Sequence, residues 1–211
     1  MKTMKVAIVG AGGHAQVVAS TLIAAGHEIS GFFVDDSSSW GKMVLGYPVS
    51  GPTTEISSSN CSHAIIGIGD NAVRQRVSLS LNVEWAKAVH PFSWVHPGVE
   101  LGPGTIVCAG AIVQAGSVVG SHVILNTKAS VDHDCRVGDF VHVAVAHMAG
   151  GASAAEGAFL ALGSTILPGI HVGAWATVGA GAVVTKDVEA RMTVVGIPAR
   201  PISSKGLRPA S

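Results

Sequence analysis

The chain has 211 residues, enough for one large domain or two small ones with a buried core. Lys plus Arg and Asp plus Glu number 13 each, so the formal net charge is zero and no overall field favours a nucleic acid or an anionic membrane surface. Charged residues make up 12% and aromatic residues 5% of the chain, so the core must consist mainly of Val, Ile, Leu and Ala, which is typical of β-rich proteins.

The first part of the chain alternates between apolar runs and helical patterns. Strands are expected at residues 5–9, 29–34 and 63–68, and helices at residues 15–25 and 72–81. Strands that alternate with helices predict a small, parallel, Rossmann-like α/β domain over residues 1–85. This stretch has room for about three strands, half of a full dinucleotide fold.

A glycine-rich turn joins the first predicted strand to the first predicted helix. Gly10, Gly12 and Ala15 fit the dinucleotide fingerprint, and Asp35 lies 25 residues beyond Gly10, near where a ribose-binding acid would sit. Backbone N–H groups at the start of a helix also suit the diphosphate of another nucleotide-linked ligand. The pattern leaves both ligands open, although NAD would be crowded in so small a domain.

From residue 95 onward, aliphatic residues recur every six positions. The repeat runs through Val95, Leu101, Val107, Val113, Val119, Leu125, Val131, Val137 and Val143, slips back by one residue, and continues at Met148, Ala154, Leu160, Ile166, Val172, Val178 and Val184. A six-residue period is typical of a β-helix, in which each hexad forms one flat face and glycines permit the corners. About 18 residues per coil predict about five coils, with an irregularity near residues 143–148.

Titratable side chains enter this repeat between residues 124 and 143. His133 is followed by Asp134, and His142 comes nine residues later. An imidazole suits proton removal near neutral pH, and a carboxylate beside it can fix its tautomer. Adjacent residues on a strand point to opposite sides, so Asp134 can reach His133 only where the chain turns a corner. The alternative is that both are exposed polar residues on a solvated face.

The repeat resembles the hexapeptide-repeat acyltransferases, which fold as a left-handed parallel β-helix. Together with the glycine-rich front end and the closing TVVGIPARPI, the chain resembles the sugar-nucleotide acetyltransferases of bacterial glycan synthesis typified by PglD and NeuD. The resemblance implies an acetyl-CoA-dependent N-acetyltransferase for a nucleotide-linked 4-amino-4,6-dideoxy sugar, acting by direct attack. It places the acyltransferase domain at residues 86–211. The synthesis of lipopolysaccharide or a related glycan is the implied setting. O-acetylation of a sugar or sialic acid, and a non-catalytic nucleotide-binding β-helix protein, remain alternatives.

The resemblance also implies roles for individual residues. His133 would be the catalytic base, with Asp134 as its partner where some members have Glu, and His142 would hydrogen-bond the acetyl thioester. The residues implied to line the pantetheine groove are Leu162, Gly163 and Gly181, and those implied to bind the nucleotide-linked sugar are Gly12, Gly13, His14, Asp35, Asp36 and Gly69. The alternatives are corner glycines and, for the two aspartates, a polar strand end. Charges at Lys186, Arg191 and Arg200 could meet CoA phosphates. A homotrimer is implied, in which His133 and His142 serve one site from different chains.

Other features argue against further classes. His142 and His147 share the H-x4-H spacing of metal ligands in β-helical carbonic anhydrases, but Ile106 stands where the third ligand is expected, so we expect no metal site. The first residues lack the long apolar stretch and cleavage site typical of a signal peptide, and no run of about 18 apolar residues occurs in the sequence, so we expect neither a signal peptide nor a membrane span. The widely spaced cysteines suit reduced thiols, and Cys135 is expected to be a buried thiol rather than a nucleophile. We expect a cytoplasmic protein without a nucleic-acid partner or membrane insertion.

Overall fold

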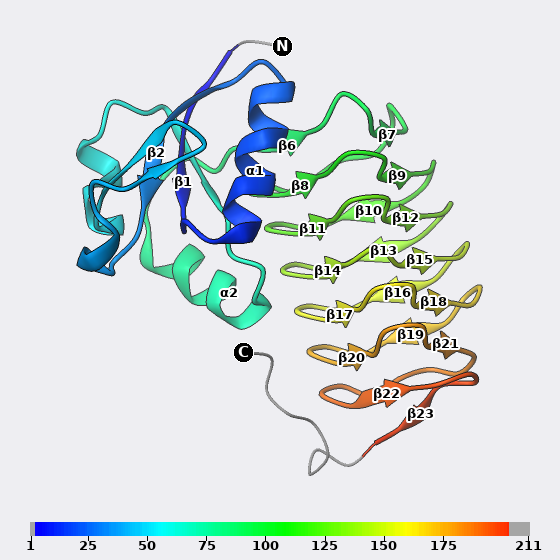
Figure 1. The fold of residues 1–211 in the computed structure, drawn as a ribbon. Coiled ribbons are helices and arrows are strands. Elements are labelled where there is room, and N and C mark those ends of the chain that lie inside the picture. Colours follow the sequence, from blue (N-terminus) through cyan, green and yellow to red (C-terminus); the bar gives the residue numbers. More distant parts are fainter. Residues whose placement is uncertain (1–2, 203–211) are drawn as a thin grey trace.

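The computed structural model describes residues 3–202. In Figure 1 an α/β unit, coloured from blue to green, lies against one side of a stack of coils that runs from green to red. The unit contains β1 (Lys5–Val9), α1 (Gly13–Ala24), β2 (Glu28–Phe33), β3 (Met43–Val44), β4 (Tyr47–Gly51), β5 (His63–Ile66) and α2 (Asn71–Ser80), with 3-10 turns at Ser37–Ser39 and Thr53–Ser58. No helix among residues 3–202 is long and apolar enough to cross a membrane.

The sheet of the α/β unit has five strands in the order β3-β4-β2-β1-β5. All neighbouring pairs are parallel except β3 with β4, which form a hairpin. The three predicted strands are present, but the expectation of about three strands was too low. The hairpin gave no clear signal because β3 has only two residues and β4 contains Pro48 and Gly51, which are poor strand formers.

The coils form a triangular prism with three parallel faces. The first face contains β6 (Ala88–Val89), β8 (Ile106–Val107), β11 (Ile124–Leu125), β14 (His142–Val143), β17 (Phe159–Leu160), β20 (Thr177–Val178), β22 (Thr193–Val195) and the antiparallel β23 (Arg200–Pro201). The second face contains β7 (Trp94–Val95), β9 (Ile112–Val113), β12 (Ser130–Val131), β15 (His147–Met148), β18 (Thr165–Ile166) and β21 (Val183–Val184). The third face contains β10 (Val118–Val119), β13 (Arg136–Val137), β16 (Ser153–Ala154) and β19 (His171–Val172).

The aliphatic residues of the six-residue repeat fill the centre of the prism. From Val107 to Val184 every predicted position belongs to one buried cluster, and Val95 and Leu101 pack against it. Successive coils are in register, as where Ile106 pairs with Ile124. The left-handed parallel β-helix predicted for this part of the chain is confirmed.

The chain turns at three edges of the prism, where residues with left-handed backbone dihedrals recur. The first edge, between the first and second faces, carries Gly110, Lys128, Val145, Gly163 and Gly181; the second edge, between the second and third faces, Gly116, Asp134, Gly151 and Gly169; the third edge Gly104, His122, Phe140, Gly157 and Trp175. The interval is six residues from Gly104 to Phe140 but five from Phe140 to Val145, since 145 − 140 = 5. This short turn is the irregularity expected near residues 143–148.

The α/β unit packs on the first face of the prism. Ile106 and Ile124 point outward from that face, yet both are fully buried in a cluster with α1 residues such as Val18 and Leu22. This burial fixes the carboxyl end of β1, and the turn that follows it, beside the first face. In Figure 1, α1 and α2 both lie on this side of the stack.

Candidate active site

His133 and Asp134 occupy the turn between β12 and β13, on the second edge. Asp134 has a φ of 58°, so the two neighbouring side chains converge instead of pointing to opposite sides as they would on a strand. Asp134 Oδ2 lies 2.8 Å from His133 Nδ1, and both side chains are well exposed, at 70% and 63%. The corner that this contact requires is therefore present.

The Asp134 carboxylate sets the chemistry of the His133 ring. Nδ1 donates to it, which leaves Nε2 as the proton-accepting atom. The hydrogen bond to Asp134, followed by the charge of Asp132, raises the pKa of His133 above its ordinary value. Asp132 also accepts from the His133 backbone N–H at 2.8 Å and so fixes the start of the turn. The arrangement is that of an oriented general base.

Two glycines give this pair its space. A Cβ built on Gly150 would collide with Nε2 of His133, and one built on Gly116, a coil earlier, would collide with the Asp134 carboxylate. Neither glycine was singled out from the sequence, because the repeat contains many glycines and only the stacking of the coils tells which of them faces the pair.

His142 lies on β14, on the first face, and is 9% exposed. Thr127 N–H donates to Asn126 Oδ1 at 2.8 Å, so the amide nitrogen of Asn126 faces His142 Nε2 at 3.1 Å. Because that nitrogen can only donate, Nε2 accepts, and Nδ1 donates to the Gly69 carbonyl at 3.3 Å. Asn126 is a site residue that the sequence reasoning missed, because only its hydrogen bond to His142 in the next coil gives it a role.

Burial keeps the histidines of this region neutral. Desolvation, and then the charge of Arg74, lowers the pKa of His142 to about 3 and that of His14 to about 4. The two rings lie 6.0 Å apart, and Nε2 of His14 is buried without a hydrogen-bond partner among the described residues. His14 and Gly69 therefore lie beside His142, where the α/β unit meets the first face.

The other residues predicted for the nucleotide-linked sugar lie in nearby loops. Gly12 is the N-cap of α1 and Gly13 its first residue, and no side chain caps this end. Asp35 follows β2 and accepts from the N–H and hydroxyl of Thr53 at 2.9 and 2.8 Å. Asp36 accepts from Ser38 N–H at 3.0 Å. Both aspartates thus stabilise their own loops, as a polar strand end would.

Two cavities lie where the α/β unit meets the prism. One, of about 580 Å³, lies between the start of α2 and the first face; its lining includes Gly69, Asn71, His142, Phe159 and Trp175. The other, of about 360 Å³, is lined by residues of α1 such as Gly13 and Gln16 and by His90, Cys108 and Thr127 of the prism. Both are open to a ligand that bridges the α/β unit and the prism.

The predicted pantetheine residues gather on the first edge. Gly181 N–H donates to the Leu162 carbonyl at 2.8 Å, and Gly163 stacks on Gly181. Leu162 is 60% exposed beside them. Within one chain these residues and His133 therefore lie on different edges of the prism.

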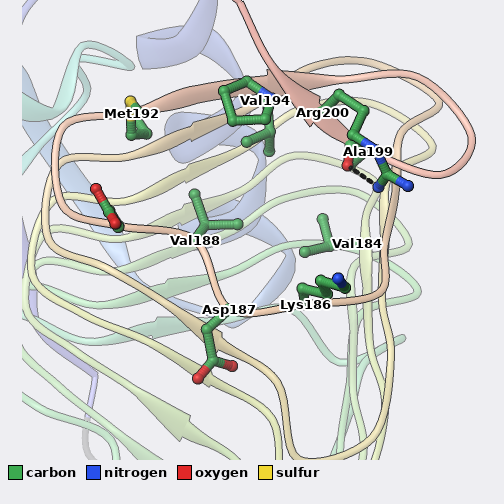
Figure 2. A pocket seen from close by; sticks show the side chains of 10 residues that line it. Val184, Lys186, Asp187, Val188, Met192, Val194, Ala199 and Arg200 are labelled. Atoms are coloured by element: carbon green, nitrogen blue, oxygen red, sulfur yellow. Dashed lines mark hydrogen bonds between the residues drawn. The ribbon is translucent and has the colours of Figure 1, made fainter.

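A further cavity of about 320 Å³ opens at the last coil (Figure 2). Its lining includes the apolar side chains of Val184, Val188 and Val194 and the basic residues Lys186 and Arg200. It shares no lining residue with the cavity beside His142. Two of the three basic residues that the sequence suggested for CoA phosphates, Lys186 and Arg200, thus line one cavity, while Arg191 is not part of this lining.

Cys135 faces the interior. It is fully buried, its Sγ lies 3.2 Å from the Ala149 carbonyl, and burial raises the pKa of the thiol. The side chain is a core residue, as expected, and cannot reach a ligand at the second edge. Among residues 3–202, no group of three or more His, Cys, Asp or Glu side chains is placed to hold a metal ion; His142 and His147 lie on different faces.

The chain is similar in sequence and in fold to known proteins. The family described as PglD N-terminal domain matches residues 5–81. PerB from Caulobacter crescentus, in a crystal structure with CoA and GDP-perosamine, is 37% identical, with 94% of this chain and 97% of that chain covered and a TM-score of 0.89. The acetyltransferase domain of PglB from Neisseria gonorrhoeae is 36% identical, with 95% and 100% covered and a TM-score of 0.88.

A curated relative matches over a shorter stretch. Serine acetyltransferase from Bacillus pumilus is 38% identical over 85 residues, which are 36% of this chain and 39% of that protein. The chain thus spans well under half the length of this relative. The agreement with PerB and the PglB domain, in contrast, extends over both halves of the fold. The chain belongs to the PglD/NeuD-like sugar acetyltransferases.

Proposed function

We propose that the protein is an acetyl-CoA-dependent N-acetyltransferase that acts on the amino group of a nucleotide-linked 4-amino-4,6-dideoxy sugar. The observation that carries the proposal is the contact of 2.8 Å between His133 Nδ1 and Asp134 Oδ2, which leaves an exposed Nε2 as base. PerB, similar over nearly its whole length, was crystallised with CoA and GDP-perosamine, and the PglB domain with acetyl coenzyme A.

The proposed reaction is a direct transfer. The sugar amine attacks the thioester carbon, His133 Nε2 takes the proton that the amine loses, and the new C–N bond replaces the C–S bond. The proton then passes to the departing CoA sulfur, so His133 returns to its neutral form. Asp134 stabilises the imidazolium formed in between. No acyl-enzyme is needed.

Asn126 and His142 are proposed to face the acetyl group. In the tautomer described above His142 Nε2 accepts a hydrogen bond, so it has no N–H to offer an acyl oxygen. Asn126 Nδ2 carries two N–H bonds, and His142 uses one of them. The second can donate to the oxygen on which charge develops, and a fixed donor of this kind stabilises the transition state.

The α/β unit is proposed to hold the nucleotide. Gly12, Gly13 and His14 stand at the N-terminus of α1, where backbone N–H groups favour a diphosphate. Asp35, Asp36 and Gly69 are proposed to contact the remainder of the nucleotide-linked sugar. Residues 1–85 would form this substrate domain and residues 86–211 the acyltransferase domain, whose last nine residues lie outside the described part of the chain. A cytoplasmic location is part of the proposal.

A complete site is proposed to need a second copy of the chain, within a homotrimer. His133 is on the second edge, whereas His142 is on the first face and Leu162 and Gly181 are on the first edge. Exposed apolar side chains on and near the second face also favour contact between copies, among them Phe92 at 81% and Trp94 at 52%. If the second edge of a neighbouring copy lay beside Leu162 and Gly181, the His133 of that copy would lie next to the pantetheine arm.

The test is an assay of the purified chain with acetyl-CoA and a panel of GDP-, UDP- and dTDP-linked 4-amino sugars. We expect thiol release with at least one sugar and a product that gains one acetyl group. The product should resist mild hydroxylamine, because amides are stable where esters are cleaved. Turnover of hydroxyl acceptors alone, or of none of the panel, would contradict the proposal.

A further inference from the structure

Arg74, on α2, is a fully buried cation outside the groups already described. Its side chain is 1% exposed, and all five guanidinium N–H groups have acceptors. Nε donates to His122 O at 2.8 Å; Nη1 to Ile68 O and Gly69 O at 3.1 Å each; and Nη2 to Phe140 O at 2.7 Å and Asn71 Oδ1 at 2.8 Å. Its pKa is lowered to about 10, mainly by burial, so it stays charged at neutral pH.

The acceptors belong to two bodies of the fold. His122 and Phe140 are successive corner residues of the third edge of the prism, while Gly69 lies in the loop that leads into α2 and Asn71 is the first residue of α2. Asn71 continues the contact, because its amide nitrogen donates to Gly157 O, at the next corner, at 3.0 Å. The loop is thus fastened along three consecutive corners of the same edge.

The same loop reaches the candidate site. The Gly69 carbonyl accepts from Arg74 and also from Nδ1 of His142. Asn71 and His142 line one cavity. A displacement of residues 69–71 would therefore change the cavity wall and break one of the two hydrogen bonds that fix the tautomer of His142.

We propose that Arg74 is a positioning residue, which holds residues 69–71 against the third edge of the prism. The glycine-rich turn before α1 and the part of the cavity that His142 lines then keep the spacing that lets one substrate contact both. The proposal rests on the proposed function. Arg74 touches no reacting atom; it acts through Gly69 and Asn71. Misplacement of a reacting group by about 1 Å can lower a rate about 100-fold, so a side chain that touches no reacting atom can still affect the rate strongly.

A lysine cannot replace this side chain. The acceptors are four carbonyls and one amide oxygen in different directions around a planar fork, and an ammonium has three donors on a tetrahedral centre. Arg74→Lys should therefore keep the charge but lose part of the positioning. Arg76, exposed on the same helix, provides the matched control.

The first measurement compares Arg74→Met, Arg74→Lys and Arg76→Met in the whole chain, with thermal melts and sedimentation to verify folding and assembly. We expect kcat/KM for the amino sugar to fall about 100-fold in Arg74→Met and about 10-fold in Arg74→Lys, while Arg76→Met stays within about threefold of wild type. The loss should fall mainly on kcat. If Arg74→Met does not fold, the kcat/KM of Arg74→Lys decides whether Arg74 is a positioning residue.

The second measurement determines the protonation and hydrogen bonding of the His142 ring nitrogens in the absence of substrate. The ¹⁵N shifts of His142 should show a protonated, hydrogen-bonded Nδ1 in wild type and in Arg76→Met, and a changed Nδ1 shift in the Arg74 variants, because the Gly69 carbonyl is then displaced from Nδ1. A folded Arg74→Lys protein with wild-type kcat/KM and unchanged His142 shifts would overturn the proposal. If wild type acetylates no amino sugar, the proposed function fails, yet the ring shifts still decide whether Arg74 positions His142.

Discussion

Oδ2 of Asp134 lies 2.8 Å from Nδ1 of His133, its neighbour in the chain, because Asp134 takes a left-handed backbone conformation at a corner of the prism. The base and its orienting carboxylate thus come from one turn. Their relative position depends on that turn alone, whereas the space around them depends on the coils before and after it.

Asp134→Asn should move the pH dependence. A general base must be neutral, so kcat/KM should rise with pH through the pKa of His133 and level off above it. Asp134 raises that pKa above 6.5, so its removal should move the acid limb to lower pH. The plateau should also fall, because the base is weaker. A limb that stays in place, or moves to higher pH, would contradict the role given to Asp134.

Gly150→Ala should slow the enzyme without unfolding it. The new methyl group would occupy the space that His133 Nε2 now faces, so the ring must turn away. We expect kcat to fall at least about 10-fold, as for a displaced general base. Gly98→Ala is the control, since its Cβ makes an ordinary contact of 3.4 Å with His96. Equal rates for the two variants in a steady-state assay would argue against the orientation of His133.

Asn126→Ala tests the donor proposed for the acyl oxygen. Loss of one such donor typically costs about 100-fold in kcat. KM for acetyl-CoA should change little, because the lost hydrogen bond strengthens in the transition state. Gln114→Ala removes an exposed amide from the neighbouring face and should keep wild-type kinetics. A variant of Asn126 with raised KM and unchanged kcat would make the residue a binding group only.

Mixed oligomers test whether His133 and His142 serve one site from different chains. His133→Asn and His142→Ala proteins should each be inactive. After they are unfolded together and refolded in equal amounts, about three quarters of the trimers are mixed, and each mixed trimer holds one intact site of three. Activity should therefore return to about a quarter of that of refolded wild type. No recovery, with mixed trimers present by mass spectrometry, would place both histidines of a site in one chain.

Much of this architecture could be predicted from the sequence. The six-residue spacing located the inward-pointing residues and the irregular coil, because the core of a β-helix is filled by one position per hexad. The pairing of His133 with Asp134 could also be anticipated, since it needs only a corner within one hexad. Features that depend on residues close together in the sequence could thus be predicted from local patterns.

The remaining features depend on contacts between distant segments. In the sequence, Arg74 looks like an ordinary exposed cation of a helix. It can be buried only because the carbonyls of His122 and Phe140, 48 and 66 residues away, accept hydrogen bonds from its guanidinium. Asn126 gains its role by its hydrogen bond to His142 in the next coil, and Gly150 by lying one coil beyond His133. Such partners follow from the register of the coils and from the docking of α2, which no single stretch of sequence encodes.

The most direct measurement is kcat/KM of His133→Asn against the panel of nucleotide-linked amino sugars, with His171→Asn, exposed on the third face, as control. The account predicts a folded protein with turnover lowered by at least about 100-fold, as for the loss of a general base. The control should match wild type. Turnover of the His133 variant equal to that of wild type would contradict the account.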